Sequence, residues 1–156
     1  MTAQDIIEVS RELAASGKGR PKQAFLRRSI STAYYALFHA LAGSCADMFI
    51  GGASADQSGT AWRRVYRSLN HAHTKNQCNS RRISEFPKEI QDFASLFAIM
   101  QVKRHKADYD PSEKFQKSKV LLDIDEVQAM QEGFAAVPAR ERRAFAAYVL
   151  MKSRRD

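Results

Sequence analysis

Apolar residues recur along most of this sequence with the spacing of an amphipathic α-helix. The first stripe consists of Ile6, Val9 and Leu13. Thr2 stands in front of it as an expected N-cap, with Asp5 three residues further on. Gly17 and Gly19 then interrupt the pattern and are expected to end this helix.

The longest predicted helix begins near Pro21 and ends near Phe49. Its apolar stripe repeats every three or four residues and consists of Ile30, Tyr34, Leu37, Leu41, Cys45 and Met48. Beside the stripe runs a row of small residues that would let another helix approach closely, namely Ala33, Ala36, Ala40 and Gly43. The two patterns together predict a helix at the centre of a bundle.

Two segments rich in small and polar residues interrupt the helical pattern after this point. Gly51–Gly59 is expected to be a loop, and it lacks the preceding strand and the following lysine of a phosphate-binding P-loop. A third helix is predicted over Thr60–His71, and the polar stretch Thr74–Ser84 is predicted to be a second loop.

The second half of the sequence predicts three more helices. The fourth runs from about Phe86 to Asp108, with Pro87 in its first turn. Ser112–Leu122 is ambiguous, and an extended conformation stays open. Asp123 is expected to cap a fifth helix, and Glu126 would complete its capping box. The fifth helix carries the stripe Val127, Met130 and Phe134.

A sixth helix is predicted from Pro138 through the apolar stretch 144–151 to a basic tail, Lys152, Arg154 and Arg155. No internal repeat and no sign of a second domain are present in the sequence. We therefore expect an all-α bundle of five to six helices in a single domain over residues 1–156. Its core would cover about 3–136, followed by a C-terminal helix at about 138–152.

Composition narrows the class of protein. The chain has 156 residues, of which 44% are apolar, so it can bury a core of ordinary size. No stretch approaches the roughly 20 apolar residues of a membrane span, and charged residues interrupt the N-terminus where a secretory signal would lie. We expect a cytoplasmic protein in which Cys45 and Cys78 are reduced structural thiols.

The formal net charge of +8 is concentrated in part of the chain. Residues 57–84 contain no acidic residue. They carry the candidate nucleic-acid-binding residues Arg63, Arg64, Arg67, Arg81 and Arg82, together with Lys75 and the aromatic residues Trp62 and Tyr66. Such a segment suits phosphate contacts with aromatic stacking on unpaired bases, and a solvated helix face with a basic loop is the alternative.

Histidines offer a second kind of chemistry. His71 and His73 are two residues apart, which points them to different sides of a helix, so a shared metal ion is not expected. No metal and no cofactor are predicted for this chain. His39 lies within the central helix, either as a hydrogen-bonded group between helices or as a proton-transfer or phosphate-binding group.

Arg104 should point toward the interior, because it continues the apolar stripe of the fourth helix, which consists of Phe86, Ile90, Phe93, Phe97 and Met100. A buried arginine requires a partner, because leaving its charge unpaired is costly. Asp108 lies one turn later on the same face, and the hydroxyl of Tyr109 follows. The pair could fix the end of the helix, or the arginine could be held there to meet a phosphate.

The segments SISTAYYALFHAL at 29–41 and RHKADYDP at 104–111 together resemble the HEPN superfamily of small helical bundles. The resemblance covers roughly residues 3–136. It implies a protein that binds or cleaves RNA, since many members are metal-independent endoribonucleases of toxin–antitoxin or defence systems. It also implies a homodimer and an antitoxin partner.

On this resemblance Arg104 matches the motif arginine, and Asp108 and Tyr109 complete the Ala-Asp-Tyr element. Tyr109 stands where ribonucleases of the family carry histidine. In a cleavage reaction Arg104 would stabilise charge on the phosphate, and His39 or Tyr109 would move a proton. A non-catalytic module that binds nucleotide, nucleic acid or protein is the alternative. A structural adaptor using the apolar sixth helix stays open.

Overall fold

The computed structural model describes residues 1–16, 19, 22–52 and 58–154. These residues form helices and connecting segments without a strand, and the predicted all-α bundle is confirmed. The helices are α1 (Ala3–Ala15), α2 (Gln23–Ile50), α3 (Gly59–Ser68), α4 (His71–Cys78), α5 (Lys88–Tyr109), α6 (Lys117–Ala135) and α7 (Ala139–Leu150), with a 3₁₀ turn η1 (Arg81–Glu85). Four predicted features lie outside the described residues: the break at Gly17, the helix start at Pro21, the middle of the predicted loop at 53–57, and Arg155.

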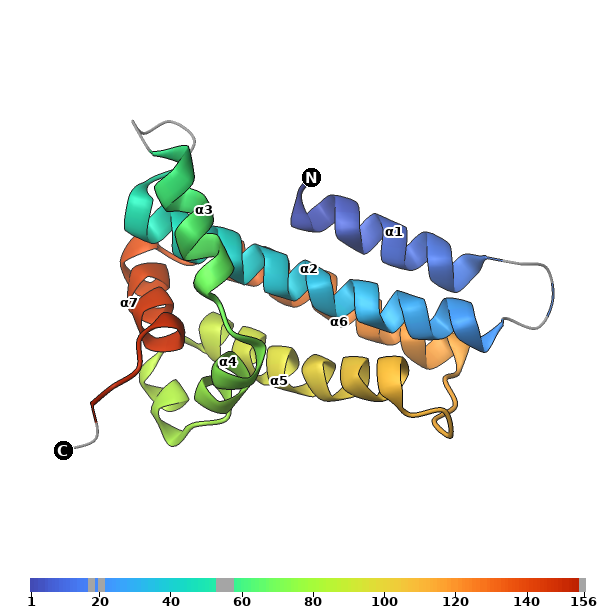
Figure 1. Cartoon of the computed structure of the whole chain (residues 1–156). Helices are drawn as coiled ribbons and strands as arrows, with labels where there is room; N and C mark the ends of the chain where they lie inside the picture. Colours follow the sequence, from blue (N-terminus) through green and yellow to red (C-terminus); the bar gives the residue numbers. More distant parts are fainter. Residues whose placement is uncertain (17–18, 20–21, 53–57, 155–156) are drawn as a thin grey trace.

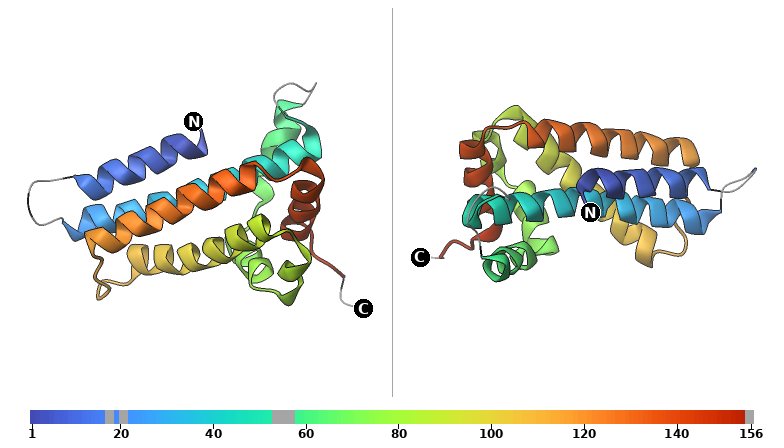
Figure 2. Two further views of the ribbon diagram at one scale, coloured as in Figure 1. Left: turned by 180° about the vertical axis from the view of Figure 1, so that it is seen from behind. Right: turned by 90° about the horizontal axis from the view of Figure 1, so that it is seen from above.

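Four long helices lie lengthwise against one another, and the short ones gather at one end (Figure 1). Helix α2 packs against α1, α3, α5, α6 and α7, which confirms its predicted central place. The reverse and top views show α6 running along α2 on the side away from α3 and α4 (Figure 2). The end formed by α3, α4, η1 and α7 carries most of the predicted basic surface.

Helix α2 follows the sequence pattern closely, whereas the predicted apolar stripe of α1 is only partly right. Ile6 is buried, but Val9 is 49% exposed, because α1 turns the face with Ile7, Ser10 and Ala14 toward the bundle. The Thr2 hydroxyl accepts a hydrogen bond from the Asp5 N–H, and the Asp5 carboxylate accepts one from the Thr2 N–H, so α1 begins with a capping box. In α2 the predicted stripe is buried from Ile30 to Cys45. Ser10 and Ser29 exchange hydrogen bonds with each other's backbone carbonyls, at 2.8 and 2.7 Å, and hold α1 close to α2.

The predicted third helix and the loop after it are wrong in their boundaries. Helix α3 ends at Ser68, and Asn70 caps a separate helix, α4, by accepting a hydrogen bond from the His73 N–H at 2.9 Å. Most of the stretch predicted to be a polar loop is helical, in α4 and η1. Its helical face was hidden from the pattern because α4 buries only two residues, Thr74 and Cys78.

The predicted start of the fifth helix is also wrong. Helix α6 begins at Lys117, within the segment for which an extended conformation was open, and buries Val120 one turn before Ile124. Asp123 therefore lies inside α6 rather than at its cap. Its carboxylate forms an ion pair of 2.7 Å with Lys103 of α5, which ties these two helices together.

Most of the apolar residues of helix α7 pack against other helices of the same bundle. Phe145, Ala146 and Val149 are buried, and the Phe145 ring lies edge-on to Phe86 and Phe134. The exposed apolar remainder of the helix and its C-cap is small, chiefly Met151. The apolar content of this helix therefore supports the core and gives little support to an adaptor surface.

One connected core includes residues from α1, α2 and α4–α7. Both cysteines are free and buried, and burial raises the pKa of the Cys45 and Cys78 thiols to about 12, so neither is a ready nucleophile. Within the described part of the chain, no helix combines the length and the apolar character required to cross a membrane.

Candidate functional site

Arg104 lies on the face of α5 that meets the middle of α2. Its Nη2 donates a hydrogen bond of 3.1 Å to the Tyr35 hydroxyl, and its guanidinium lies 5.5 Å from the centre of the Tyr35 ring and 5.9 Å from that of Tyr34. Its Nε is 2.9 Å from a carboxylate oxygen of Asp108, an ion pair whose N–H is not aligned for a hydrogen bond. The Arg104 side chain remains 18% exposed, so its charge is fixed in direction but still open to solvent.

The last turn of α5 is anchored by α2, and this places Arg104 and Asp108. The Arg27 guanidinium donates to the backbone carbonyls of Ala107, Asp110 and Glu113, which cover the end of α5 and the turn beyond it. The positive charge of Arg27 also interacts favourably with the negative end of the α5 helix dipole. The Ser31 hydroxyl donates a longer hydrogen bond, 3.4 Å, to the Asp108 carboxylate.

His71, the first residue of α4, completes the cluster. Its Nδ1 is 2.6 Å from the Tyr34 hydroxyl, and its ring stacks on Phe38 with 4.0 Å between ring centres. Partial burial lowers the pKa of His71, and the nearby Arg104 charge lowers it further. Burial also raises the pKa of Tyr34 well above its usual value, so its hydroxyl stays protonated. Near neutral pH the cluster therefore holds an arginine cation beside an uncharged imidazole.

We expect His71 to titrate below the value of about 6.5 that is usual for histidine. Its neutral form then favours the folded protein above pH 6.5, and this contribution falls as the pH drops toward the lower pKa of the folded state. The Arg104→Gln variant removes one of the two causes and should move the His71 pKa upward. An NMR titration of the imidazole protons measures the His71 pKa in the unmodified protein and in the variant. An unchanged His71 pKa in Arg104→Gln would contradict an interaction between Arg104 and His71.

The other two predicted catalytic residues lie apart from this cluster. The His39 Nδ1 pairs with the Tyr66 hydroxyl at 2.5 Å, which makes His39 a hydrogen-bonded group between α2 and α3. Tyr109 ends α5 with 66% of its surface exposed, and its ring contacts that of His105. His39, Arg104 and Tyr109 line three different hollows of the surface. The geometry brings Arg104 and Asp108 together and leaves His39 and Tyr109 outside.

A basic hollow of about 330 Å³ adjoins Arg104. It lies between α4 and α5, and its lining residues are Lys75, Gln101, Val102, Arg104, His105 and Lys106. Lys75, Arg104 and Lys106 give this lining three positive charges. Asp108, which forms an ion pair with Arg104, is not itself one of the lining residues. A hollow with this charge favours an anion such as a phosphate group.

Helix α3 presents the predicted nucleic-acid-binding arginines to solvent. Arg63, Arg64 and Arg67 are exposed, whereas Trp62 and Tyr66 are half-buried and stack on each other with 5.4 Å between ring centres. The Trp62 Nε1 donates to the Asp47 carboxylate at 2.9 Å. The two aromatic residues therefore attach α3 to α2, and Tyr66 also lines an open groove.

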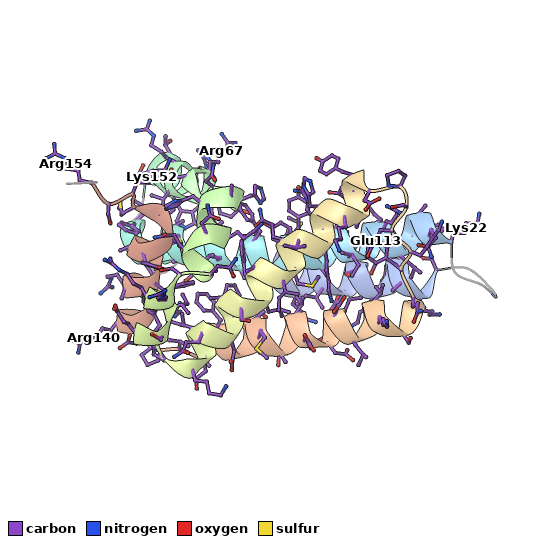
Figure 3. All side chains as sticks on the ribbon, turned by 90° about the horizontal axis from the view of Figure 1, so that it is seen from below. Lys22, Arg67, Glu113, Arg140, Lys152 and Arg154 are labelled. Carbon is purple, nitrogen blue, oxygen red and sulfur yellow. The ribbon has the colours of Figure 1, made fainter. Side chains whose placement is uncertain are left out.

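Arg81 and Arg82 of η1 are exposed at the same end of the molecule. Arg82 shares a groove of about 510 Å³ with Lys152 and Arg154 of the C-terminal tail. Figure 3 shows Lys152 and Arg154 at the end of the molecule that carries Arg67, opposite Lys22 and Glu113. The acid-free segment and the basic tail thus contribute to one positively charged end.

Sequence reasoning missed Tyr34, Tyr35 and His71 as parts of the site. The consecutive tyrosines belong to the motif at 29–41, and Tyr34 was recognised as a core position. His71 was considered only as a possible metal ligand, because its nearness to Arg104 depends on how α4 packs on α5 and brings His71 to Tyr34 of α2.

The cluster around Arg104 offers a fixed cation, a neutral imidazole and tyrosine hydroxyls beside a basic hollow. These groups can bind a phosphodiester and accept a proton from a hydroxyl group. Within the described residues, no group of three or more His, Cys, Asp or Glu side chains is placed to hold a metal ion. No family model matches the sequence, and no curated protein and no solved structure matches it either.

Proposed function

We propose that this chain is a HEPN-like cytoplasmic protein that binds single-stranded RNA, with a phosphate of the RNA at Arg104. The observation that carries the proposal is the placement of Arg104. Its guanidinium is oriented by Tyr35 and Asp108 at the edge of a hollow that also contains Lys75 and Lys106. An arginine that only fixed a helix end would not need this cationic surrounding, because like charges repel one another.

The distribution of the remaining charge supports the same proposal. The exposed arginines of α3 and η1 and the basic tail provide contacts for a longer anionic chain, and no acidic residue interrupts residues 57–84. Phosphate contacts of this kind supply affinity without sequence preference. The homodimer and the antitoxin partner implied by the resemblance belong to this proposal as well.

Binding of fluorescently labelled single-stranded RNA, measured by anisotropy at several salt concentrations, tests it. We expect the variant with Arg63, Arg64 and Arg67 changed to glutamine to bind more weakly. Its plot of log affinity against log salt should be less steep by about two, since each phosphate contact contributes roughly 0.7 for a single strand.

The matched control changes three exposed lysines at the opposite end of the bundle to glutamine, namely Lys114, Lys117 and Lys119. Both variants lose the same formal charge, so a difference between them reports position rather than net charge. Equal salt dependence of the two variants would contradict the proposed surface. Absence of binding by the unmodified protein at low salt would overturn the proposed function.

Metal-independent RNA cleavage is a second candidate, and the position of His71 favours it. In the tautomer whose Nδ1–H donates to the Tyr34 oxygen, neutral His71 has the lone pair of Nε2 available to accept a proton. It would take the proton of a ribose 2′-hydroxyl, whose oxygen attacks the adjacent phosphorus. The bond from phosphorus to the 5′-oxygen then breaks and leaves a 2′,3′-cyclic phosphate and a 5′-hydroxyl after protonation. Arg104 would stabilise the charge that develops on the phosphate oxygens.

A further inference from the structure

An open groove of about 650 Å³ runs between α1, α2 and α3 on the other side of Tyr35. Its lining includes the aliphatic residues Ile6 and Val9 and the ring-bearing residues Tyr35, Phe38, His39 and Tyr66. Aliphatic side chains of α1 form one wall, and four rings from α2 and α3 form the other. The groove is within the usual size range of sites for small organic groups.

The groove and the Arg104 cluster share a wall made of two rings. The Tyr35 ring lines the groove, while its hydroxyl accepts the hydrogen bond from Arg104. The Phe38 ring lines the groove as well and stacks on His71 within the cluster. A ligand in the groove therefore lies one ring away from the arginine that we propose to hold phosphate.

The chemistry of the groove selects a flat, largely apolar group rather than a phosphate. Its walls are almost entirely apolar, so an anion would lose hydration there, and Asp5 is its one acidic lining residue. A nucleobase has an apolar face that stacks on aromatic rings, and several bases carry amino groups that can donate a hydrogen bond to a carboxylate. Tyr66 also connects the groove to α3, whose exposed arginines suit the sugar-phosphate chain.

We propose that this groove receives an unpaired nucleobase of the bound RNA, stacked against Tyr35, while the adjoining phosphate lies at Arg104. The inference rests on the proposed binding of single-stranded RNA and gives a structural reason for it. A base in a double helix is stacked between its neighbours and cannot enter the groove.

The experiment compares a short oligoadenylate with a base-free ribose-phosphate chain of the same length. Both carry the same number of phosphates, so electrostatic binding is equal and the difference in affinity measures the bases. We expect the unmodified protein to bind oligoadenylate about 10-fold more tightly, in line with the known contribution of base stacking. Fluorescence quenching of a 2-aminopurine placed within the oligonucleotide reports the stacking directly.

Two variants of Tyr35 separate the ring from the hydroxyl. Tyr35→Phe keeps the ring and loses the hydrogen bond to Arg104, so it should retain most of the preference for bases. Tyr35→Leu removes the ring, so its preference should fall to nearly none. Phe49→Leu is the matched control, because Phe49 is on the same helix, is also 40% exposed and does not line the groove. Thermal unfolding verifies that each variant is folded.

Equal binding of the two chains by the unmodified protein would overturn this inference and leave the proposed RNA binding intact. Failure of both chains to bind at low salt would instead overturn the proposed function. A preference for bases that Tyr35→Leu retains would also overturn the inference, since the bases would then bind elsewhere. A dimer that Tyr35→Leu converts to a monomer in analytical ultracentrifugation would show that a second copy covers the groove, which contradicts a nucleobase.

Discussion

Replacing Arg104 by alanine is expected to weaken the binding of single-stranded RNA by about 10- to 100-fold. A hydrogen bond between charged groups contributes roughly 1.5–3 kcal/mol, and this change removes the cation that Tyr35 and Asp108 orient. The measurement is fluorescence anisotropy with labelled RNA at one low salt concentration. The Arg11→Ala variant is the matched control, because Arg11 also forms an ion pair, with Asp125, but on the face where α1 meets α6.

Changing the carboxylate of the Arg104–Asp108 ion pair should affect RNA binding in the direction opposite to Arg104→Ala, and the Arg11–Asp125 ion pair again supplies the control. Asp108→Asn removes the charge that competes with phosphate for Arg104, so RNA binding should become tighter. Asp125→Asn changes the net charge by the same amount and should alter binding much less. If Arg104 served only to fix the end of α5, Arg104→Ala and Asp108→Asn would both lower stability and neither would change RNA binding selectively. That result would contradict the phosphate role.

The second large effect concerns RNA cleavage. If the protein cleaves RNA in the presence of EDTA, we expect His71→Gln to slow the reaction by about 100-fold or more, since a positioned general base commonly contributes 10²–10⁴. The rate should rise with pH on the acidic side and reach its half-maximal value below pH 6.5, because the pKa of His71 is lowered. Single-turnover assays over a range of pH, with products separated by electrophoresis, measure both quantities.

His105→Gln is the control for this experiment at saturating RNA. His105 lines the same basic hollow as Arg104, so this variant shows the effect of losing a histidine from the binding surface while the proposed base stays in place. Unchanged cleavage in His71→Gln would assign the proton transfer to another group. Absence of cleavage by the unmodified protein, together with tight RNA binding, would leave the non-catalytic module as the function.

Much of the fold could be predicted because the buried face of a long amphipathic helix appears in the sequence as apolar residues every three or four positions. The stripe from Ile30 to Cys45 identified α2 and its central place, and Thr2 with Asp5 identified the start of α1. The short helix α4 could not be found in this way. It buries one residue per turn, and it is stabilised by its cap and by packing on α5 and α7 rather than by an apolar stripe.

The start of α6 was misplaced for a related reason. Asp123 has the sequence context of a cap, but its carboxylate is used by Lys103 of the neighbouring helix. An acidic residue before an apolar stripe is equally compatible with a cap and with an ion pair between helices. The distinction depends on which helix lies alongside, which local pattern does not contain.

The candidate site was predictable only along single helices. The register of α5 placed Arg104 and Asp108 on one face, and their ion pair follows from the spacing of four residues. The Tyr34–His71 hydrogen bond joins residues 37 positions apart, and the contacts of Arg27 reach more than 80 positions along the chain. Such contacts arise from the packing of whole helices, so periodicity cannot supply them.

The short helix α3 contributes less to the buried core than the long helices of the bundle do. All ten of its residues are described and none is buried, so it adds little to the core that α2 organises. It is attached to α2 by the Trp62–Asp47 and Tyr66–His39 hydrogen bonds and by the half-buried side chains of Val65 and Tyr66, which pack against the edge of the core. Detaching it should cost only a part of the free energy of global unfolding. The three arginines of α3 are thus carried on an arm that can adjust to the path of a flexible strand, while Arg104 stays fixed on the rigid body of the bundle.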